Sequence, residues 1–471
     1  MAGLIFIDSI VFFVFLAIAI FILFRFKRIN KISKSFFFLL LFYVVCSYSS
    51  YNMMVKPIHD YNMAIARTFI FHFKVIGPLA PLDIVFLISL MFIGLRKIVQ
   101  RNLLTFRLDI DTAFFIKFIL IQGVVIVTIS TLAFVLHTYG GGKGQLTDQL
   151  LYFRGIIYFL VVVYLYQLAV DDFKRLGFYK VFSLFLLLDV INAISGFIST
   201  IIYKDYVWSR YGINVSIIDQ DDVYNFLTVY ALLAVTFLFT KPIKRIYIYT
   251  AILGIGFLIF ANIYKYIFML AALFFFYDTF VNAMKGKVAV FKIMIAALSI
   301  VLLTSTIVML STSKSMNTRS GQITDYWEYT GSKFPASIIG IGHGGQFYSP
   351  TETDDDGEVK AILKESSMAN YKRNIQTPVV SFIKTIGPLG TVIAIAFLIY
   401  GLMKITFINV RLPFNPLYNA IFFNLIWMMT VSVGFFQSGP FVILTIAKLL
   451  IFVTAIRHVE KVDEPKKSIS S

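Results

Sequence analysis

Apolar stretches of membrane-spanning length recur along nearly the whole chain, and they constrain its fold more than any other feature. A helix needs about 20 mostly apolar residues to cross a bilayer. Hydrophobic residues make up 59% of the chain and charged residues only 14%, which is too little charge to cover a soluble surface of this size. The sequence therefore predicts an all-α, polytopic integral membrane protein.

The apolar runs predict about thirteen transmembrane helices. We expect these helices near Leu4–Phe24, Phe36–Val55, Val75–Leu95, Ala113–Leu136, Gly155–Val170, Phe178–Ile202, Tyr224–Phe239, Ile246–Ala261, Tyr266–Val281, Val290–Ser311, Pro378–Met403, Leu417–Phe435 and Phe441–Ile456. The first run has neither a basic leading segment nor a small-residue cleavage site, so we expect it to remain in the protein as a helix.

Lysines and arginines cluster in alternate short connections between the predicted helices. More than half of the 42 Lys and Arg residues fall on the side that holds the segment 25–34. Because short cytoplasmic loops are enriched in positive residues, the pattern predicts a periplasmic N-terminus and a cytoplasmic C-terminus. The expected domains are a ten-helix bundle, a long periplasmic loop, three more helices and a cytoplasmic tail, at 1–311, 312–377, 378–456 and 457–471.

The formal net charge of +17 lies in short basic clusters between apolar runs. This pattern is typical of contact with anionic membrane lipid, and we expect no nucleic-acid partner. The sequence contains no phosphate-binding loop, dinucleotide-binding glycine motif or metalloprotease motif. Its one cysteine, Cys46, lies in an apolar run, and its five histidines are scattered, so we expect no disulfide, no metal site and no cofactor.

The segment 312–377 is the one long polar stretch, and we expect a solvated loop there. Its acidic tract 352–358 is typical of a mobile surface segment. Within the loop, Arg319 and Trp327 precede Pro335 and a glycine-rich turn.

That turn, residues 340–345, contains Gly340, Gly342 and His343. Glycines let backbone amides approach an anion closely, and Arg319 offers a planar fork for phosphate. His343 can exchange a proton near neutral pH. The alternative is a surface loop whose glycines form turns and whose aromatic residues lie at the membrane interface.

These features together resemble the superfamily of O-antigen polymerases and O-antigen ligases. The resemblance covers the many-helix layout, a long outer loop before the last helices, and the order Arg–Trp–Pro–Gly-x-Gly in that loop. It extends to Gly387-x-x-Gly390 at the start of the next helix.

Two positions depart from the family pattern. Gln376-Thr377 stand where family members carry a His-Asn pair, which favours the polymerase branch over the ligase branch. The family's Ser-x-Ser-Arg turn corresponds to Asn262–Lys265, where Lys265 keeps the positive charge without the planar fork of arginine.

The resemblance implies a glycosyltransferase of the bacterial inner (plasma) membrane. It would polymerise undecaprenyl-pyrophosphate-linked repeat units of O-antigen, capsule or exopolysaccharide on the outer face of that membrane. The expected partners are these lipid-linked glycans, membrane lipids, a chain-length regulator and a flippase.

The implied chemistry needs cations that stabilise the departing pyrophosphate and a base that takes the acceptor proton. Arg319, Arg210 and His343 are the expected catalytic residues. His343 is the first choice of base, with Asp325 or Glu328 as alternatives. The expected substrate-binding residues are Lys265, Lys384, Trp327, Gly340, Gly342 and Gln376.

Two other functions remain open. One is a glycan ligase of the same superfamily, which would transfer the finished chain. The other is a lipid-linked oligosaccharide flippase or secondary transporter, which performs no covalent chemistry.

Ionisable residues within the apolar runs are costly in hydrocarbon. Asp189 and Lys448 lie near the middle of their predicted helices, and we expect them to pair as a structural contact. Asp8 and Asp83 lie near outer helix ends, where we expect water to be close.

Overall fold

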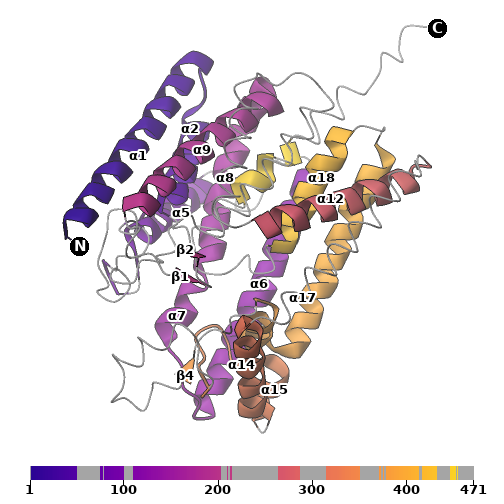
Figure 1. The fold of residues 1–471 in the computed structure, drawn as a ribbon. Helices are drawn as coiled ribbons and strands as arrows, with labels where there is room; N and C mark the ends of the chain where they lie inside the picture. The colour runs from indigo at the N-terminus through magenta and orange to yellow at the C-terminus, as the bar shows by residue number, and fades with distance from the viewer. Residues whose placement is uncertain are drawn as a thin grey trace.

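The structure is a computed structural model that describes residues 2–49, 70, 75–77, 79–99, 110–202, 209–210, 213–214, 264–286, 314–331, 333–350, 371–372, 375, 378–412, 416–431, 446–451 and 453–454. This part of the chain is mainly helical (Figure 1), as predicted. The helices are α1 (Ala2–Asn30), α2 (Lys34–Ser49), α5 (Pro81–Val99), α6 (Ile110–Tyr139), α7 (Leu146–Leu151), α8 (Arg154–Leu176), α9 (Phe178–Ile202), α12 (Tyr264–Met284), α14 (Lys314–Gly331), α15 (Ala336–Ile339), α17 (Pro378–Arg411) and α18 (Pro416–Val431). Two short antiparallel pairs accompany them, β1 (Ser209–Arg210) with β2 (Ile213–Asn214) and β3 (Phe347–Tyr348) with β4 (Tyr371–Lys372).

Long apolar helices support the prediction that the chain is a membrane protein. Within the described residues, 4 helical segments are long and apolar enough to cross a bilayer, with mean hydropathy from 1.8 to 2.9. They are Gly3–Asn30, Phe114–Tyr139, Leu146–Leu176 and Val380–Arg411. The predicted helices at Tyr224–Phe239, Ile246–Ala261 and Val290–Ser311 lie outside the described residues.

Helix α5 begins later than the apolar run alone predicts. Its first residue is Pro81, whose fixed φ and missing N–H suit the first turn of a helix. The Asp83 carboxylate accepts a hydrogen bond from the amide of Ala80 at 2.8 Å, which caps the helix start. Ile76 and Leu79, which precede the helix, are joined instead by an isolated antiparallel bridge. The helix boundary is therefore set by proline and a cap rather than by hydropathy.

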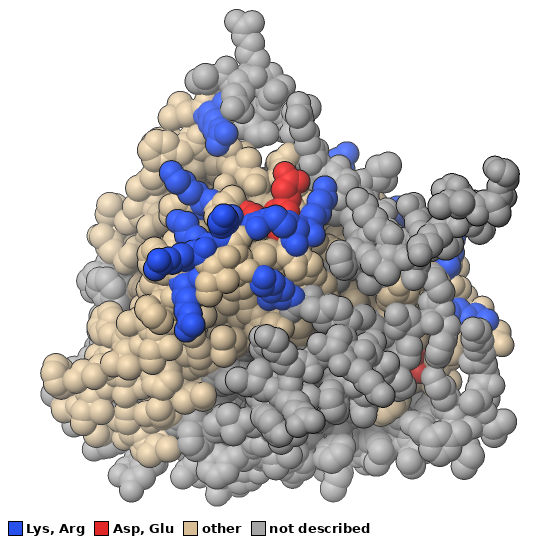
Figure 2. Space-filling model, turned by 90° about the horizontal axis from the view of Figure 1, so that it is seen from above, with Lys and Arg blue, Asp and Glu red and all other residues tan. Residues whose placement is uncertain are grey.

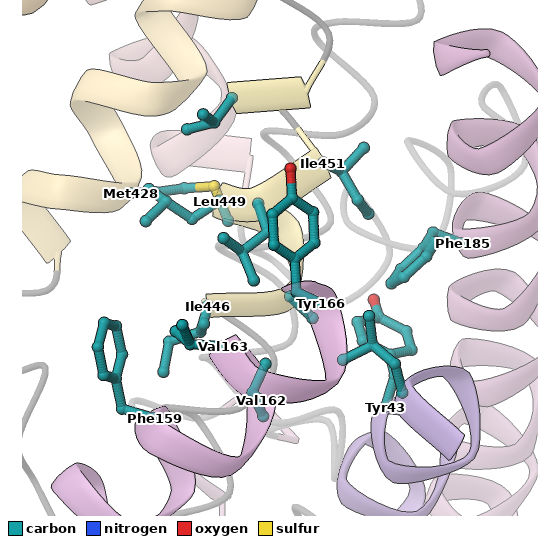
Figure 3. Close-up of a cluster of buried hydrophobic side chains, with 14 of the residues drawn as sticks. Tyr43, Phe159, Val162, Val163, Tyr166, Phe185, Met428, Ile446, Leu449 and Ile451 are labelled. Carbon is teal, nitrogen blue, oxygen red and sulfur yellow. The ribbon is translucent and has the colours of Figure 1, made fainter. Parts of the chain in front are cut away.

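Side chains from helices far apart in the sequence form the core. Helix α1 packs on α9, α2 on α8, and α6 on α17. Figure 3 shows Tyr43, Tyr166 and Phe185 packed close to residues of the C-terminal segment, including Leu449. The C-terminal residues 446–451 thus lie inside the core formed by the first helices.

Asp189 and Lys448 pair as predicted. The Lys448 Nζ lies 3.2 Å from Asp189 Oδ2, and both side chains are buried. The Tyr43 hydroxyl donates to the second oxygen of Asp189. This pair ties α9 to α2 and to the C-terminal segment.

Asp8 and Asp83 are buried, which corrects the expectation that water lies close to them. Asp8 is 1% exposed and Asp83 is 2% exposed. Ser199 donates to Asp8, while Asp83 accepts from Tyr158 and pairs with the Arg154 guanidinium at 2.7 Å. Protein donors therefore replace water at both carboxylates.

The long polar segment is also more ordered than the expected loop. It contains α14 and α15, and Phe347 of β3 packs with Tyr326 of α14 and with Ile341 and Ile375 in a small separate core. Helix α14 is polar and was not predicted, because its stability comes from this packing rather than from a long apolar run. The acidic tract 352–358 lies outside the described residues.

Candidate functional site

Two glycine-rich segments close on each other at one end of the molecule. The first, residues 140–145, joins α6 to α7, and the second, residues 340–346, follows α15. Gly144 and Gly345 form an antiparallel bridge. The Gln145 amide donates to the Gly344 carbonyl at 2.9 Å, and the Gln346 amide donates to the Lys143 carbonyl at 2.8 Å. We call this pair of segments the glycine clasp.

Side chains of α6 and α7 hold the second segment of the clasp in place. The Ser130 hydroxyl accepts from the His343 amide at 3.0 Å, and the Gln149 side-chain carbonyl accepts from the Gly344 amide at 3.1 Å. Gln149 also donates to Ser130 and Thr131 and is buried. A network of buried polar groups thus replaces the water that these backbone groups would otherwise need.

The sequence suggests that backbone amides of the glycine-rich turn bind an anion, but in the structure these amides have other partners. The amides of Gly340, Ile341, His343, Gly344 and Gly345 all donate to acceptors within the protein. These donors are therefore occupied in this structure, and they are not directed at an open anion site.

The glycines instead permit close packing. Gly342 has φ +79°, and an added Cβ would lie 2.4 Å from the Cβ of Phe134 and 2.7 Å from the Ser130 carbonyl oxygen. Gly340 has φ +82°, and an added Cβ would lie 2.6 Å from both the Gly387 amide and the Lys384 carbonyl. Only glycine combines this backbone conformation with this separation.

Helix α17 is kinked where the clasp meets it. Gly387 has φ 72° and ψ 172°, and Pro388 follows it, so the helical hydrogen-bond pattern is interrupted. The turn before the kink carries Lys384, whose carbonyl accepts from the Ile341 amide at 2.8 Å. The kink therefore directs the first part of α17 onto the clasp.

Lys384 is almost fully buried, with an exposed fraction of 1%. Its Nζ donates to the His343 carbonyl at 2.9 Å, so the ammonium is in direct contact with the backbone of the clasp. A buried positive charge is costly unless polar groups surround it. The contact places a fixed cation next to the turn that carries His343.

His343 is half-buried and lies flat against an aromatic ring. Its imidazole stacks on Tyr152 with ring centroids 4.4 Å apart and an interplanar angle of 12°. Tyr152, between α7 and α8, is itself buried. Stacking fixes the plane of the imidazole, and the residue stays partly exposed.

His137, at the end of α6, joins the two segments of the clasp. Its Nε2 lies 3.2 Å from the Lys143 carbonyl and 3.3 Å from the Gln346 carbonyl. Because carbonyl oxygens only accept, Nε2 carries the hydrogen. The imidazole also contacts the Tyr329 ring at 6.0 Å between centroids. His137 is therefore a structural contact between α6, the clasp and α14.

Two lysines lie over tyrosine rings beside His137. Lys143 Nζ lies 3.9 Å from the Tyr371 ring centroid, and Lys333 Nζ lies 3.5 Å from that of Tyr329. Both distances are those of cation–π contacts. Burial raises the pKa of Tyr329, and the nearby Tyr371 raises it further. Tyr329 therefore stays a neutral phenol that can donate a hydrogen bond.

Helix α14 lies next to the clasp and packs on α15 and β3. Asp325, one of the alternative bases, accepts from the Ser349 hydroxyl at 2.6 Å, while Glu328 is exposed. Trp327 is 40% exposed and packs its ring edge against Tyr326, with centroids 5.5 Å apart. Trp327 thus lies on the outside of the small core rather than within it.

The structure brings several of the predicted residues together and leaves others undetermined. His343, Lys384, Gly340 and Gly342 meet at the clasp, and Trp327 lies on the adjoining helix. The backbones of Arg319, Arg210 and Lys265 belong to α14, β1 and α12, but their side chains lie outside the described residues, as does all of Gln376.

Sequence reasoning missed His137, Lys143, Gln149 and Tyr152. One signal was available, the unbroken Gly-Gly-Gly run at 140–142 followed by Lys143 and Gly144, which is unusual immediately after an apolar helix. The partnership of this run with residues 340–346 has no sequence signal, because the two segments are far apart in the chain.

Among the residues that the structure describes, no group of three or more His, Cys, Asp or Glu side chains is arranged to hold a metal ion. In comparisons with known proteins, the chain matches no family model, no curated protein and no solved structure.

Proposed function

We propose that this chain is a membrane glycosyltransferase that polymerises polyprenyl-pyrophosphate-linked glycan repeat units. One observation carries the proposal, namely the buried Lys384 ammonium held at the glycine clasp next to the stacked, half-buried His343. A fixed cation and a proton acceptor in one place are what transfer from a diphosphate leaving group requires.

The proposal includes about thirteen membrane spans and an outer location for the clasp. The clasp and α14 lie at the opposite end of the molecule from the connection of α8 to α9 (Figure 1). Figure 2, seen from above, shows Lys and Arg gathered around few acidic groups at that other end. Arg175, for example, donates there to the Lys31 carbonyl. A basic end favours the cytoplasm, which supports a periplasmic clasp.

In this scheme, each residue has a defined role. Lys384, with Arg319, Arg210 and Lys265, stabilises the negative charge that develops on the departing pyrophosphate. His343 accepts the proton of the acceptor hydroxyl. Trp327 and Gln376 contact the glycan, and the apolar faces of the helices hold the polyprenyl tail.

The first prediction concerns Arg319. We expect Arg319→Ala to remain in the membrane at wild-type abundance while chain extension falls by about 100-fold or more, because one charge-stabilising donor at a transition state is typically worth that much. The measurement is the product ladder made by purified protein from lipid-linked repeat units. Lys314→Ala, at the start of the same helix, is the control for loss of a positive charge. A normal ladder from the Arg319 variant would contradict the proposal.

Deletion of the gene separates the proposed polymerase from the alternatives. A polymerase defect leaves single repeat units attached to the cell surface, whereas a ligase defect removes all attached glycan. A flippase defect traps lipid-linked units on the cytoplasmic face, and that outcome would also exclude the proposed chemistry.

A further inference from the structure

Beside the clasp lies a cluster of lysines and tyrosines that the proposed chemistry does not use. Lys143, Lys333, Tyr329 and Tyr371 come from the α6–α7 connection, the α14–α15 connection, α14 and β4. We call them the lysine–tyrosine cluster. His137 contacts the cluster through Tyr329 and through the Lys143 carbonyl. Lys143 thus meets residues that lie almost two hundred positions later or more in the chain, and the same two kinds of side chain gather in one place.

The cluster is positively charged, and within the described part of the chain no carboxylate forms an ion pair with its lysines. None of the ion pairs among the described residues involves Lys143 or Lys333. The described elements next to the cluster carry three acidic residues, Asp148 in α7 and Asp325 and Glu328 in α14. The Asp325 carboxylate is engaged by Ser349, and Glu328 is exposed. Because none of these described carboxylates pairs with Lys143 or Lys333, the two ammonium groups can pair with an anionic ligand.

The buried Lys384 adds to the positive electrostatic potential around the cluster. Lys333 and Lys384 both lie close enough to His137 to act on it electrostatically. The positive charges of three lysines therefore converge on one region at the end of α6. Fixed charges near a low-dielectric interior attract an anion more strongly than isolated surface charges do.

The tyrosines indicate what kind of anion fits. Tyr329 and Tyr371 are half-buried, and Tyr371 also packs edge-on against Tyr348 at 5.7 Å between centroids. A fixed aromatic ring can pack against the apolar C–H face of a sugar ring, while its hydroxyl donates to a sugar oxygen. Neither property is needed to bind an inorganic ion.

We propose that the lysine–tyrosine cluster binds an acidic sugar of the glycan, with Lys143 and Lys333 pairing with its carboxylate and Tyr371 packing against its ring. The inference rests on the proposed function, and it adds that the repeat unit carries a uronic acid or a related acidic sugar. Cation–π contacts hold the two ammonium groups in position in the absence of the ligand.

Direct binding tests this inference without requiring turnover. The full chain in lipid nanodiscs is titrated with trigalacturonic acid and with its methyl ester, which keeps the sugar rings but removes the charge. We expect the ester to bind about tenfold more weakly or worse, because charge-assisted hydrogen bonds are lost. If the wild-type protein bound the acid and the ester with equal affinity, the inference would be overturned without any variant being needed.

Matched variants locate the site. Lys143→Gln/Lys333→Gln is expected to weaken binding of the acid about tenfold or more. Lys27→Gln/Lys404→Gln removes two lysines that also lie over aromatic rings, Phe37 and Phe114, and should bind as the wild type does. Equal loss in both double variants would indicate non-specific charge attraction and would overturn the inference.

Two further measurements distinguish binding of an acidic sugar from binding of a simple inorganic anion. Inorganic phosphate should compete only weakly, and Tyr371→Ala should weaken binding of the acid more than Tyr371→Phe does. Equal competition by phosphate would show that the cluster recognises charge alone, which would overturn the sugar assignment. A product ladder made equally well from neutral and acidic repeat units, without acid-dependent binding, would leave the proposed function standing and reject this inference.

Discussion

Lys448 and Asp189 meet among apolar side chains, where an unpaired charge would be costly. Their pairing was predictable because a charge in hydrocarbon needs a partner and few candidates lay at the same depth. The partner of Asp83 was less evident, because Arg154 lies just outside the predicted helix Gly155–Val170. Depth along a helix can be estimated from the sequence, whereas the rotation of two helices about their axes cannot.

The Asp189–Lys448 pair gives a stability prediction. Lys448→Met leaves the Asp189 carboxylate buried without its ammonium, and we expect a loss of about 3–5 kcal/mol. Removing both charges in Asp189→Asn/Lys448→Met should recover much of this loss. The measurement is the unfolding transition of the purified protein in detergent. Lys117→Met, at an exposed position in α6, is the control and should change little. A Lys448 variant as stable as the wild type would contradict the structural role of the pair.

At the scale of secondary structure elements, the glycine clasp joins the α6–α7 connection to the segment after α15. A hydropathy profile gives no indication that these two segments meet. Helices α6 and α17 were predicted from their apolar runs, and Phe178–Ile202 has the predicted bounds. Helix α14 and the clasp were not predicted, because their stability depends on tertiary contacts such as that between Gly342 and Phe134. The glycines had been interpreted as an anion cradle, since sequence alone does not distinguish a loop that binds a ligand from one that packs closely.

Two glycines with the same backbone conformation test the clasp. Gly141 and Gly342 both have positive φ, near +80°, but an added Cβ meets nothing within 4 Å at Gly141. Gly141→Ala should therefore cost only the conformational strain, about 1–2 kcal/mol. Gly342→Ala adds steric overlap with Phe134 and should cost about 1–3 kcal/mol more.

Chain extension and the unfolding transition are measured for both alanine variants. We expect the Gly342 variant to lose most of its chain-extending activity and the Gly141 variant to retain most of it. Equal effects of the two substitutions would show that close packing at the clasp is unimportant.

For the whole molecule, the two ends differ in composition. The end opposite the clasp gathers Lys and Arg side chains in one patch (Figure 2), whereas the clasp end combines the lysines of the lysine–tyrosine cluster with exposed aromatic residues such as Phe334. This division agrees with the orientation that the Lys and Arg distribution predicts. The orientation stays a prediction from composition, and the arrangement of helices within the bundle depends on packing that hydropathy does not encode.

The orientation can be tested by labelling, since Cys46 is the one native cysteine and is buried. Cysteine placed at Phe334, which is 82% exposed, should react with a membrane-impermeant thiol reagent in spheroplasts. Cysteine placed at the exposed Lys174 should react only after the membrane is permeabilised. The opposite pattern would place the clasp in the cytoplasm and would remove the basis for the proposed function.

The bridge between Gly144 and Gly345 also has a consequence for biosynthesis. During translation, the segment after α6 emerges long before the segment after α15. The ribosome must add about two hundred residues before the second half of the bridge exists, and bringing such distant segments together carries a loop-closure cost. Until then, Ser130 and Gln149 lack the backbone amides of the second clasp segment, and His137 lacks the Gln346 carbonyl. The clasp therefore assembles late, after most of the chain has been synthesised.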